Sequence, residues 1–260
     1  MQSGSLFTPN AVVSKQTMRL LITFQVVAVL CFWAVSPFPF LPRPHEVGTS
    51  LHDLWFYDNL GIELFTSFTL NLETLLVSTI LSLGLAYLNT MPFFRPMVAL
   101  FGRLRFLSMV GLSFFFTLMT KNGHQLKLSM LVFSVSVFFV TGMADVIACI
   151  PKEQYDLAKT LHMGPWRTMW EVVVLGQIDR AFEVLRQNAA IGFLMLTMVE
   201  GMSRSGGGIG SLLLNQNRYF HLSAVMAIQL CVLAIGLAQD YSIGVLRRIC
   251  CPYADLRRAK

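Results

Sequence analysis

The first candidates for chemistry are ionised residues inside otherwise apolar stretches: Glu73, Glu183, Arg186, Glu200 and Asp240. A charge at the centre of a bilayer costs about 2.5–3.5 kcal/mol on insertion scales, so such residues usually face a bundle interior or water. Each is therefore either a residue of a translocation path or a member of a structural ion pair.

Local spacing suggests roles for the residues near the start of the fifth apolar segment. Glu183 and Arg186 are three residues apart, which allows them to pair on one helix face, and we favour a structural pair over a path role. The amides Gln187 and Asn188 lie deeper, where they either line the path or bridge helices. Glu73, within the second apolar segment, is a further candidate for the path or a gate.

Glu200 and Asp240 are placed near the ends of their segments. Glu200 either gates the path or contacts a protein that delivers the solute, or it caps a helix and pairs with Arg204. Asp240 is expected to pair with Arg247 or Arg248, which follow it.

An enzymatic site is not expected. The histidines are scattered over several loops and form no H-x-x-x-H pair for a metal: His45, His52, His124, His162 and His221. The G-x-x-x-x-G-K-[ST] phosphate loop is absent from the sequence, and the glycine-rich run 206–210 contains no lysine, so it predicts a flexible turn. We expect no catalytic residue, no metal and no cofactor on this chain.

Composition indicates the elements that must position these residues. Of 260 residues, 55% are hydrophobic and 13% are charged, whereas soluble domains contain about 25% charged residues. A membrane-spanning helix needs about 20 apolar residues. The pattern predicts an all-α membrane protein with about six transmembrane helices, at 18–38, 64–90, 97–120, 126–150, 181–202 and 220–246.

The distribution of cations predicts orientation, because cytoplasmic loops are enriched in Lys and Arg. With both termini in the cytoplasm, the outer side receives only five of the 20 cations: Arg43, Lys121, Lys127, Arg204 and Arg218. The net charge of +6 then reflects membrane orientation and not a nucleic-acid surface. The predicted organisation is a cytoplasmic segment 1–17, a membrane domain 18–246 and a basic cytoplasmic tail 247–260. Within 39–63, the aromatic run 55–57 indicates either a short helix on the outer surface or an ordinary loop.

The segment 151–180, between the fourth and fifth spans, is the longest predicted cytoplasmic loop of the membrane domain. Pro151 suits a helix start, and 152–163 has helical spacing with Leu157, Ala158 and Leu161 on one face. Gly164 and Pro165 break this helix, and a second short amphipathic piece is expected over 166–174. A helix, a break and a helix below a membrane bundle form a docking element.

This segment resembles the cytoplasmic coupling loop of ABC importer permeases, with its Glu-Ala-Ala, three residues, then Gly. The positions that match are Asp156, Leu157, Ala158, Leu161, His162, Gly164 and Trp166. His162 stands where the family has glycine, which allows a turn with positive φ, so the turn is expected to move to Gly164. The Leu-Pro ending of the family's loop is Leu175-Gly176 here.

Further similarities to permeases for nitrate, sulfonate and taurine occur in the same order along 90–250. They are Phe94-Arg95-Pro96, Val199-Glu200-Gly201-Met202, the turn from Ser205-Gly206 to Ile209-Gly210-Ser211-Leu212, Asp240, and Arg247-Arg248. The resemblance implies a multi-pass permease subunit of the bacterial inner membrane, for a small and usually anionic solute. Its implied partners are a second permease copy or homologue, an external solute-binding protein, and a separate ATPase that binds ATP and Mg. The alternative is a stand-alone secondary transporter or channel.

Overall fold

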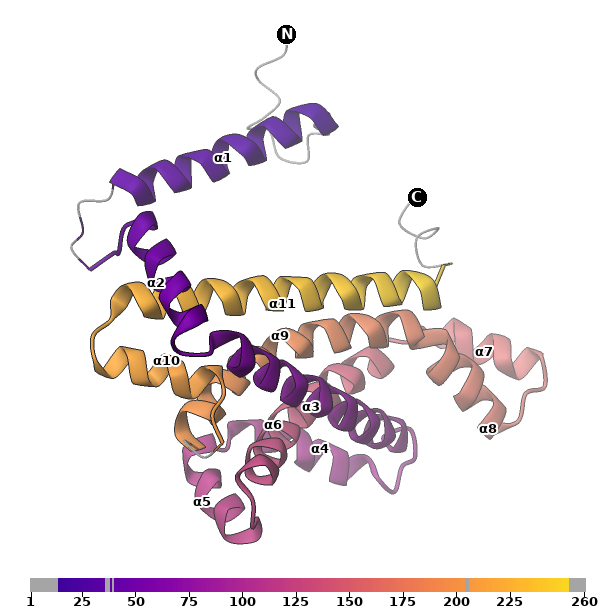
Figure 1. The fold of residues 1–260 in the computed structure, drawn as a ribbon. Coiled ribbons are helices and arrows are strands. Elements are labelled where there is room, and N and C mark those ends of the chain that lie inside the picture. Colours follow the sequence, from indigo (N-terminus) through magenta and orange to yellow (C-terminus); the bar gives the residue numbers. More distant parts are fainter. Residues whose placement is uncertain (1–13, 36–37, 39, 204–205, 253–260) are drawn as a thin grey trace.

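The computed structural model describes residues 14–35, 38, 40–203 and 206–252, and every element in that part of the chain is helical (Figure 1). The long helices are α1 (Lys15–Val35), α3 (Leu60–Leu88), α6 (Gly123–Ala148), α9 (Ile178–Ser203) and α11 (Leu222–Cys250). The short elements are α2 (Pro44–Phe56), α4 (Arg95–Arg103), η1 (Leu104–Phe106), α5 (Met109–Met119), α7 (Lys152–Thr160), α8 (Pro165–Thr168), η2 (Met169–Val174), η3 (Leu175–Gln177) and α10 (Ile209–Arg218). Most of residues 1–17 and 247–260, predicted as cytoplasmic ends, lie outside the described residues.

Four helices of the described chain, α1, α3, α6 and α11, are long and apolar enough to cross a membrane. The prediction of an all-helical protein with several such helices is confirmed, whereas the count of six is not. The helical bounds lie within about four residues of the predicted first, second, fourth, fifth and sixth segments.

The third predicted segment, 97–120, is not one straight helix. It is divided into a first part, α4 with η1, and a second part, α5, and the chain bends by 110° between them. Leu107 and Ser108 have extended backbones between them, with ψ of 134° and 126°. If this bent pair is one span, the number of candidate spans rises to five.

Helix α9 is long, but it is not among the four apolar helices. Its first half contains Asp179, Glu183 and Arg186, and Glu200 lies near its end. These charges leave too little continuous apolar sequence for a simple lipid-facing span. The fifth predicted span is therefore a helix whose polar face needs partners within the protein.

The core joins α3, α6 and α9. Leu75, Val135 and Ala189 pack together from these three helices. The buried face of α3 is unusually polar, with small side chains at a spacing of three or four residues: Ser67, Asn71, Thr74, Ser78 and Ser82. Small side chains of this kind allow membrane helices to approach closely.

Helices α1 and α2 lie outside this core. The segment around 55–57 is the end of a helix, α2, which packs against α11 through Val47 and Leu54. Ser50 of α2 also donates to Ser223 of α11 at 2.8 Å. Helix α1 stands apart from the rest of the bundle in Figure 1, and none of its apolar window is buried.

Candidate functional site

The helix–break–helix segment predicted over 151–180 is present. Pro151 precedes α7 as its N-cap residue, with φ of −62° and ψ of 142°. Lys159 and Asp156 form an exposed ion pair at 2.8 Å, one helical turn apart. The chain then turns and re-enters a helix at Pro165, where the fixed φ of proline favours the first helical position.

The turn after α7 is at His162 and not at Gly164, so the expected shift of the turn is wrong. His162 has a φ of 52°, whereas Gly164 has an extended backbone with a φ of −65°. The amide of His162 donates to Lys159 O at 2.9 Å, and that of Met163 donates to Ala158 O at 3.0 Å. This pair of bonds is a Schellman motif, which usually has glycine where His162 stands.

The second piece of the segment is longer and less regular than the predicted 166–174. After α8, the chain forms the π-helix η2 and the short 3₁₀ turn η3 before it joins α9. Three side chains of the segment are buried: Ala158, Val173 and Gln177 are 2%, 2% and 4% exposed. Thr90, just after α3, donates its hydroxyl to Met169 Sδ at 3.6 Å, and the segment lies at one end of the bundle, beyond α9 (Figure 1).

Several large apolar side chains of this segment are exposed, and we call four of them the ledge: Leu157, Leu161, Trp166 and Trp170. Leu157 is 61% exposed and Trp166 is 71% exposed. Of the three residues predicted to share one helix face, Ala158 is buried, whereas Leu157 and Leu161 are exposed. Exposed apolar patches mark interaction surfaces, so these side chains are candidates for a contact with a partner.

Glu200 lies in a second polar region, at the far end of α9. Its carboxylate is 1% exposed and accepts hydrogen bonds from Ser67 Oγ and from the amide of Gly210 at 2.9 Å. Its predicted partner Arg204 lies outside the described residues. Helix capping and pairing with Arg204 were the predicted local roles of Glu200. They do not include its bond to Ser67, which belongs to another helix, α3.

The glycine run after α9 is a turn, as predicted, and it is bonded on both sides. Gly206, Gly207 and Gly208 all have positive φ, between 70° and 106°. Lys127 Nζ donates to Gly207 O at 2.6 Å, and the amide of Gly208 donates to the carboxylate of Glu63. We call Glu63, Ser67, Lys127, Glu200 and residues 206–210 the glycine-turn cluster.

The other predicted path residues do not come together with Glu200. Glu73 is exposed and contacts His124 at 3.1 Å. Gln187 is exposed, whereas Asn188 is 3% exposed and donates to Val184 O at 2.8 Å. Within the described residues, Asn188 Oδ1 has no hydrogen-bond partner, so only Asn188 of these three side chains keeps a polar atom buried and unpaired.

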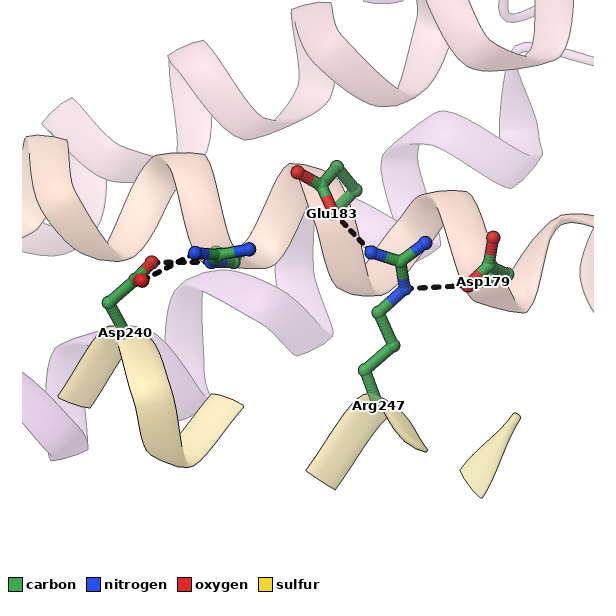
Figure 2. A network of polar contacts seen from close by, with 5 residues as sticks. Asp179, Glu183, Asp240 and Arg247 are labelled. Atoms are coloured by element: carbon green, nitrogen blue, oxygen red, sulfur yellow. Dashed lines mark hydrogen bonds and ion pairs between the residues drawn. The ribbon is translucent and has the colours of Figure 1, made fainter. Parts of the chain in front are cut away.

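Ion pairs cross between α9 and α11 (Figure 2). Arg247 lies between Asp179 and Glu183, with distances of 2.6 and 2.5 Å to their carboxylates. Arg186 forms a bidentate pair with Asp240, and both bonds measure 2.5 Å. The predicted pairing of Glu183 with Arg186 and that of Asp240 with Arg247 or Arg248 are therefore wrong.

Sequence reasoning missed several buried polar residues. Asn71 on α3 donates to Gln239 on α11 at 2.8 Å, and Lys127 on α6 is 4% exposed. The polar spacing of α3, from Ser67 to Ser82, was a visible signal for a polar helix face. The partners on other helices had no comparable signal, because no local pattern relates residues more than 100 positions apart.

Among the described residues, no group of three or more His, Cys, Asp or Glu side chains is arranged to hold a metal ion. Comparison of the chain with models of known protein families and with curated proteins finds no match.

Proposed function

We propose that this chain is the permease subunit of an ATP-driven importer of the ABC type, and that it forms the translocation path for a small solute. The observation on which this proposal rests is the ledge on the helix–break–helix segment. A segment that only connected two spans would expose polar side chains to water, whereas this one exposes Leu157, Leu161, Trp166 and Trp170.

The construction of the segment supports a docking role. Ala158, Val173 and Gln177 are buried, and the bond from Thr90 to Met169 Sδ joins the segment to the end of α3, which supports a fixed place for the ledge. The Schellman turn at His162 fixes the angle between α7 and α8. A partner that moves this segment would therefore move α9, whose other end contains Glu200.

The proposed partners follow from the resemblance of the sequence to ABC importer permeases. The ATPase would bind ATP and Mg and would contact the ledge, a second copy or homologue would complete the path, and an external protein would deliver the solute. Both termini would lie on the cytoplasmic side of a bacterial inner membrane. In this proposal, six segments cross the membrane, including α9 and the bent α4–α5 pair.

Co-expression with an ABC-type ATPase from the same organism tests the proposal. Replacing Leu157 and Leu161 by Asp should abolish co-purification of the ATPase, because two exposed apolar contacts become charged. Glu153→Ala, at an exposed position of the same helix, is the matched control and should leave the complex intact. An unchanged complex and unchanged solute-stimulated ATP hydrolysis in the double variant would contradict the proposal.

A stand-alone secondary transporter or channel is the second candidate, because a polar interior suits a solute path whether or not an ATPase drives it. Ser136 Oγ, Asn188 Oδ1 and Gln239 Nε2 are buried without a partner among the described residues. Buried polar atoms are usually hydrogen-bonded, so these atoms are available to water or solute. Purified chain in liposomes distinguishes the two candidates, because only this second candidate predicts solute uptake driven by an ion gradient without the ATPase.

A further inference from the structure

A cavity of about 710 Å³ lies between the ends of α3 and α6 and the helix–break–helix segment. Its volume is within the range of about 300–1,000 Å³ that is typical of small-molecule sites. Much of its wall is apolar and consists of Met91, Ala144, Ile147, Ala148, Met169 and Val173. The cavity is therefore suited to a hydrocarbon chain.

The position of the cavity coincides with the ends of two candidate membrane helices. Ile147 and Ala148 are at the end of α6, and Met91 lies just after α3. Tyr155 and Trp166 also line the cavity, and these residue types are enriched where a membrane meets water. Burial raises the pKa of Tyr155.

One charge distinguishes this cavity from a purely apolar groove. Among the described residues that line it, Arg95 alone is ionised, and its side chain is exposed. Arg95 Nε makes a long bond of 3.4 Å to Asn89 O, and no acidic side chain of the described chain forms an ion pair with it. A guanidinium group binds phosphate oxygens in a bidentate manner, so Arg95 suits an anionic head group.

We propose that this cavity binds one acyl chain of an anionic phospholipid of the bilayer, with the lipid phosphate on Arg95. The lipid would join the ends of α3 and α6 to the segment that bears the ledge. The position of that segment would then depend on the lipid composition of the membrane. This inference requires the cavity to lie at the membrane surface, but it does not require an ATPase partner, so it can fail independently of the importer proposal.

Trp166 provides a local reporter of lipid in the cavity. In the full chain in detergent, with Trp33, Trp55 and Trp170 replaced by Phe, Trp166 would be the remaining tryptophan. We expect phosphatidylglycerol with brominated acyl chains to quench Trp166 fluorescence at lower concentration than brominated phosphatidylcholine. Arg95→Gln should weaken phosphatidylglycerol binding about tenfold, because charge-assisted hydrogen bonds to phosphate are lost.

Two variants make the test specific. Ala148 lies on the cavity wall with an exposed side chain, so Ala148→Phe would fill the cavity with little effect on packing and should remove quenching by both lipids. Arg103→Gln, on the same helix α4 but outside this cavity, should leave quenching unchanged. Native mass spectrometry of lipid retained by the chain with all its tryptophans gives a second measurement.

Three outcomes would overturn the proposal. The first is equal quenching by the two lipids in the parent chain. The second is an Arg103→Gln effect as large as that of Arg95→Gln, which would indicate general attraction of head groups to cations. The third is undiminished quenching and lipid retention in Ala148→Phe, which would place the lipid outside the cavity.

Discussion

Ser67 of α3 donates its hydroxyl hydrogen to the carboxylate of Glu200 on α9, with oxygen distances of 2.7 and 2.9 Å, although the two residues are 133 positions apart. The same Ser67 oxygen accepts the amide of Ile209, the first residue of α10, at 2.8 Å. One hydroxyl thus joins three helices. Glu200 is 1% exposed, so its carboxylate depends on these bonds in place of water.

Ser67→Ala is expected to lower the free energy of unfolding by about 1–3 kcal/mol, because a buried carboxylate and a buried amide both lose a partner. Thermal unfolding of the purified chain in detergent measures the effect. Thr66→Ala is the matched control, since the Thr66 hydroxyl is exposed and bonds only within α3, to Ile62 O at 2.9 Å. Equal melting temperatures for the two variants would show that Ser67 does not stabilise the cluster.

Gly208→Ala should be far more harmful than Gly206→Ala, although both residues have positive φ. A Cβ at Gly208 would collide with the Glu200 carboxylate, whereas one at Gly206 would meet only Lys127 Nζ, at 3.9 Å. Left-handed backbone alone costs a non-glycine residue about 1–2 kcal/mol. We expect Gly206→Ala to lose about that amount and Gly208→Ala to lose more than 3 kcal/mol or to fail to fold. Similar yields and melting temperatures would contradict the close approach at Gly208.

Helix positions followed from the sequence because apolar periodicity and length are local properties. The bounds 64–90 and 126–150 lie within four residues of α3 and α6. The bend at 107–108 was missed because Leu107 and Ser108 interrupt no apolar pattern and include neither glycine nor proline. Their extended backbones are the feature that divides α4 and η1 from α5.

Pairing of charges could not be predicted from local spacing. Glu183 and Arg186 are well placed to pair on one helix, yet each finds a partner on α11, because the two helices pack side by side and bring Arg247 and Asp240 within reach. The turn was predicted at Gly164 and not at His162 for a related reason. Glycine is the usual residue with positive φ, but the two hydrogen bonds that close α7 determine the conformation there.

Arg247→Gln is expected to separate the start of α9 from the end of α11. Arg247 is 15% exposed and neutralises both Asp179 and Glu183, so its loss leaves two neighbouring carboxylates without this cation. The expected loss of stability is about 1–3 kcal/mol, between the values for exposed and buried ion pairs. Lys159→Gln, which removes an exposed ion pair with Asp156, should change stability by less than about 0.5 kcal/mol. Unfolding in detergent compares the two, and equal effects would contradict a structural role for Arg247.

Exchanging Arg186 and Asp240 tests whether their pair has only a structural role. The pair is bidentate, and each side chain is 40% exposed. Arg186→Asp alone places a new carboxylate near Asp240 and Glu183 and should lower the melting temperature. The double variant with Asp240→Arg should recover most of this loss. If solute transport also recovers in the double variant, the positions of these charges are not important for the path. Recovery of stability without transport would instead place Arg186 on the path.

Substitutions at His162 and Gly164 test where the turn of the docking segment lies. His162→Gly removes the strain of a φ of 52° and should stabilise the turn by about 1 kcal/mol. Gly164→Ala should be neutral or slightly stabilising, because its φ is −65° and no atom lies within 4 Å of the added Cβ. Hydrogen exchange of the Met163 amide, which is bonded to Ala158 O, reports the turn directly and should slow in His162→Gly. Faster exchange in His162→Gly together with a marked loss of stability in Gly164→Ala would place the left-handed residue at position 164.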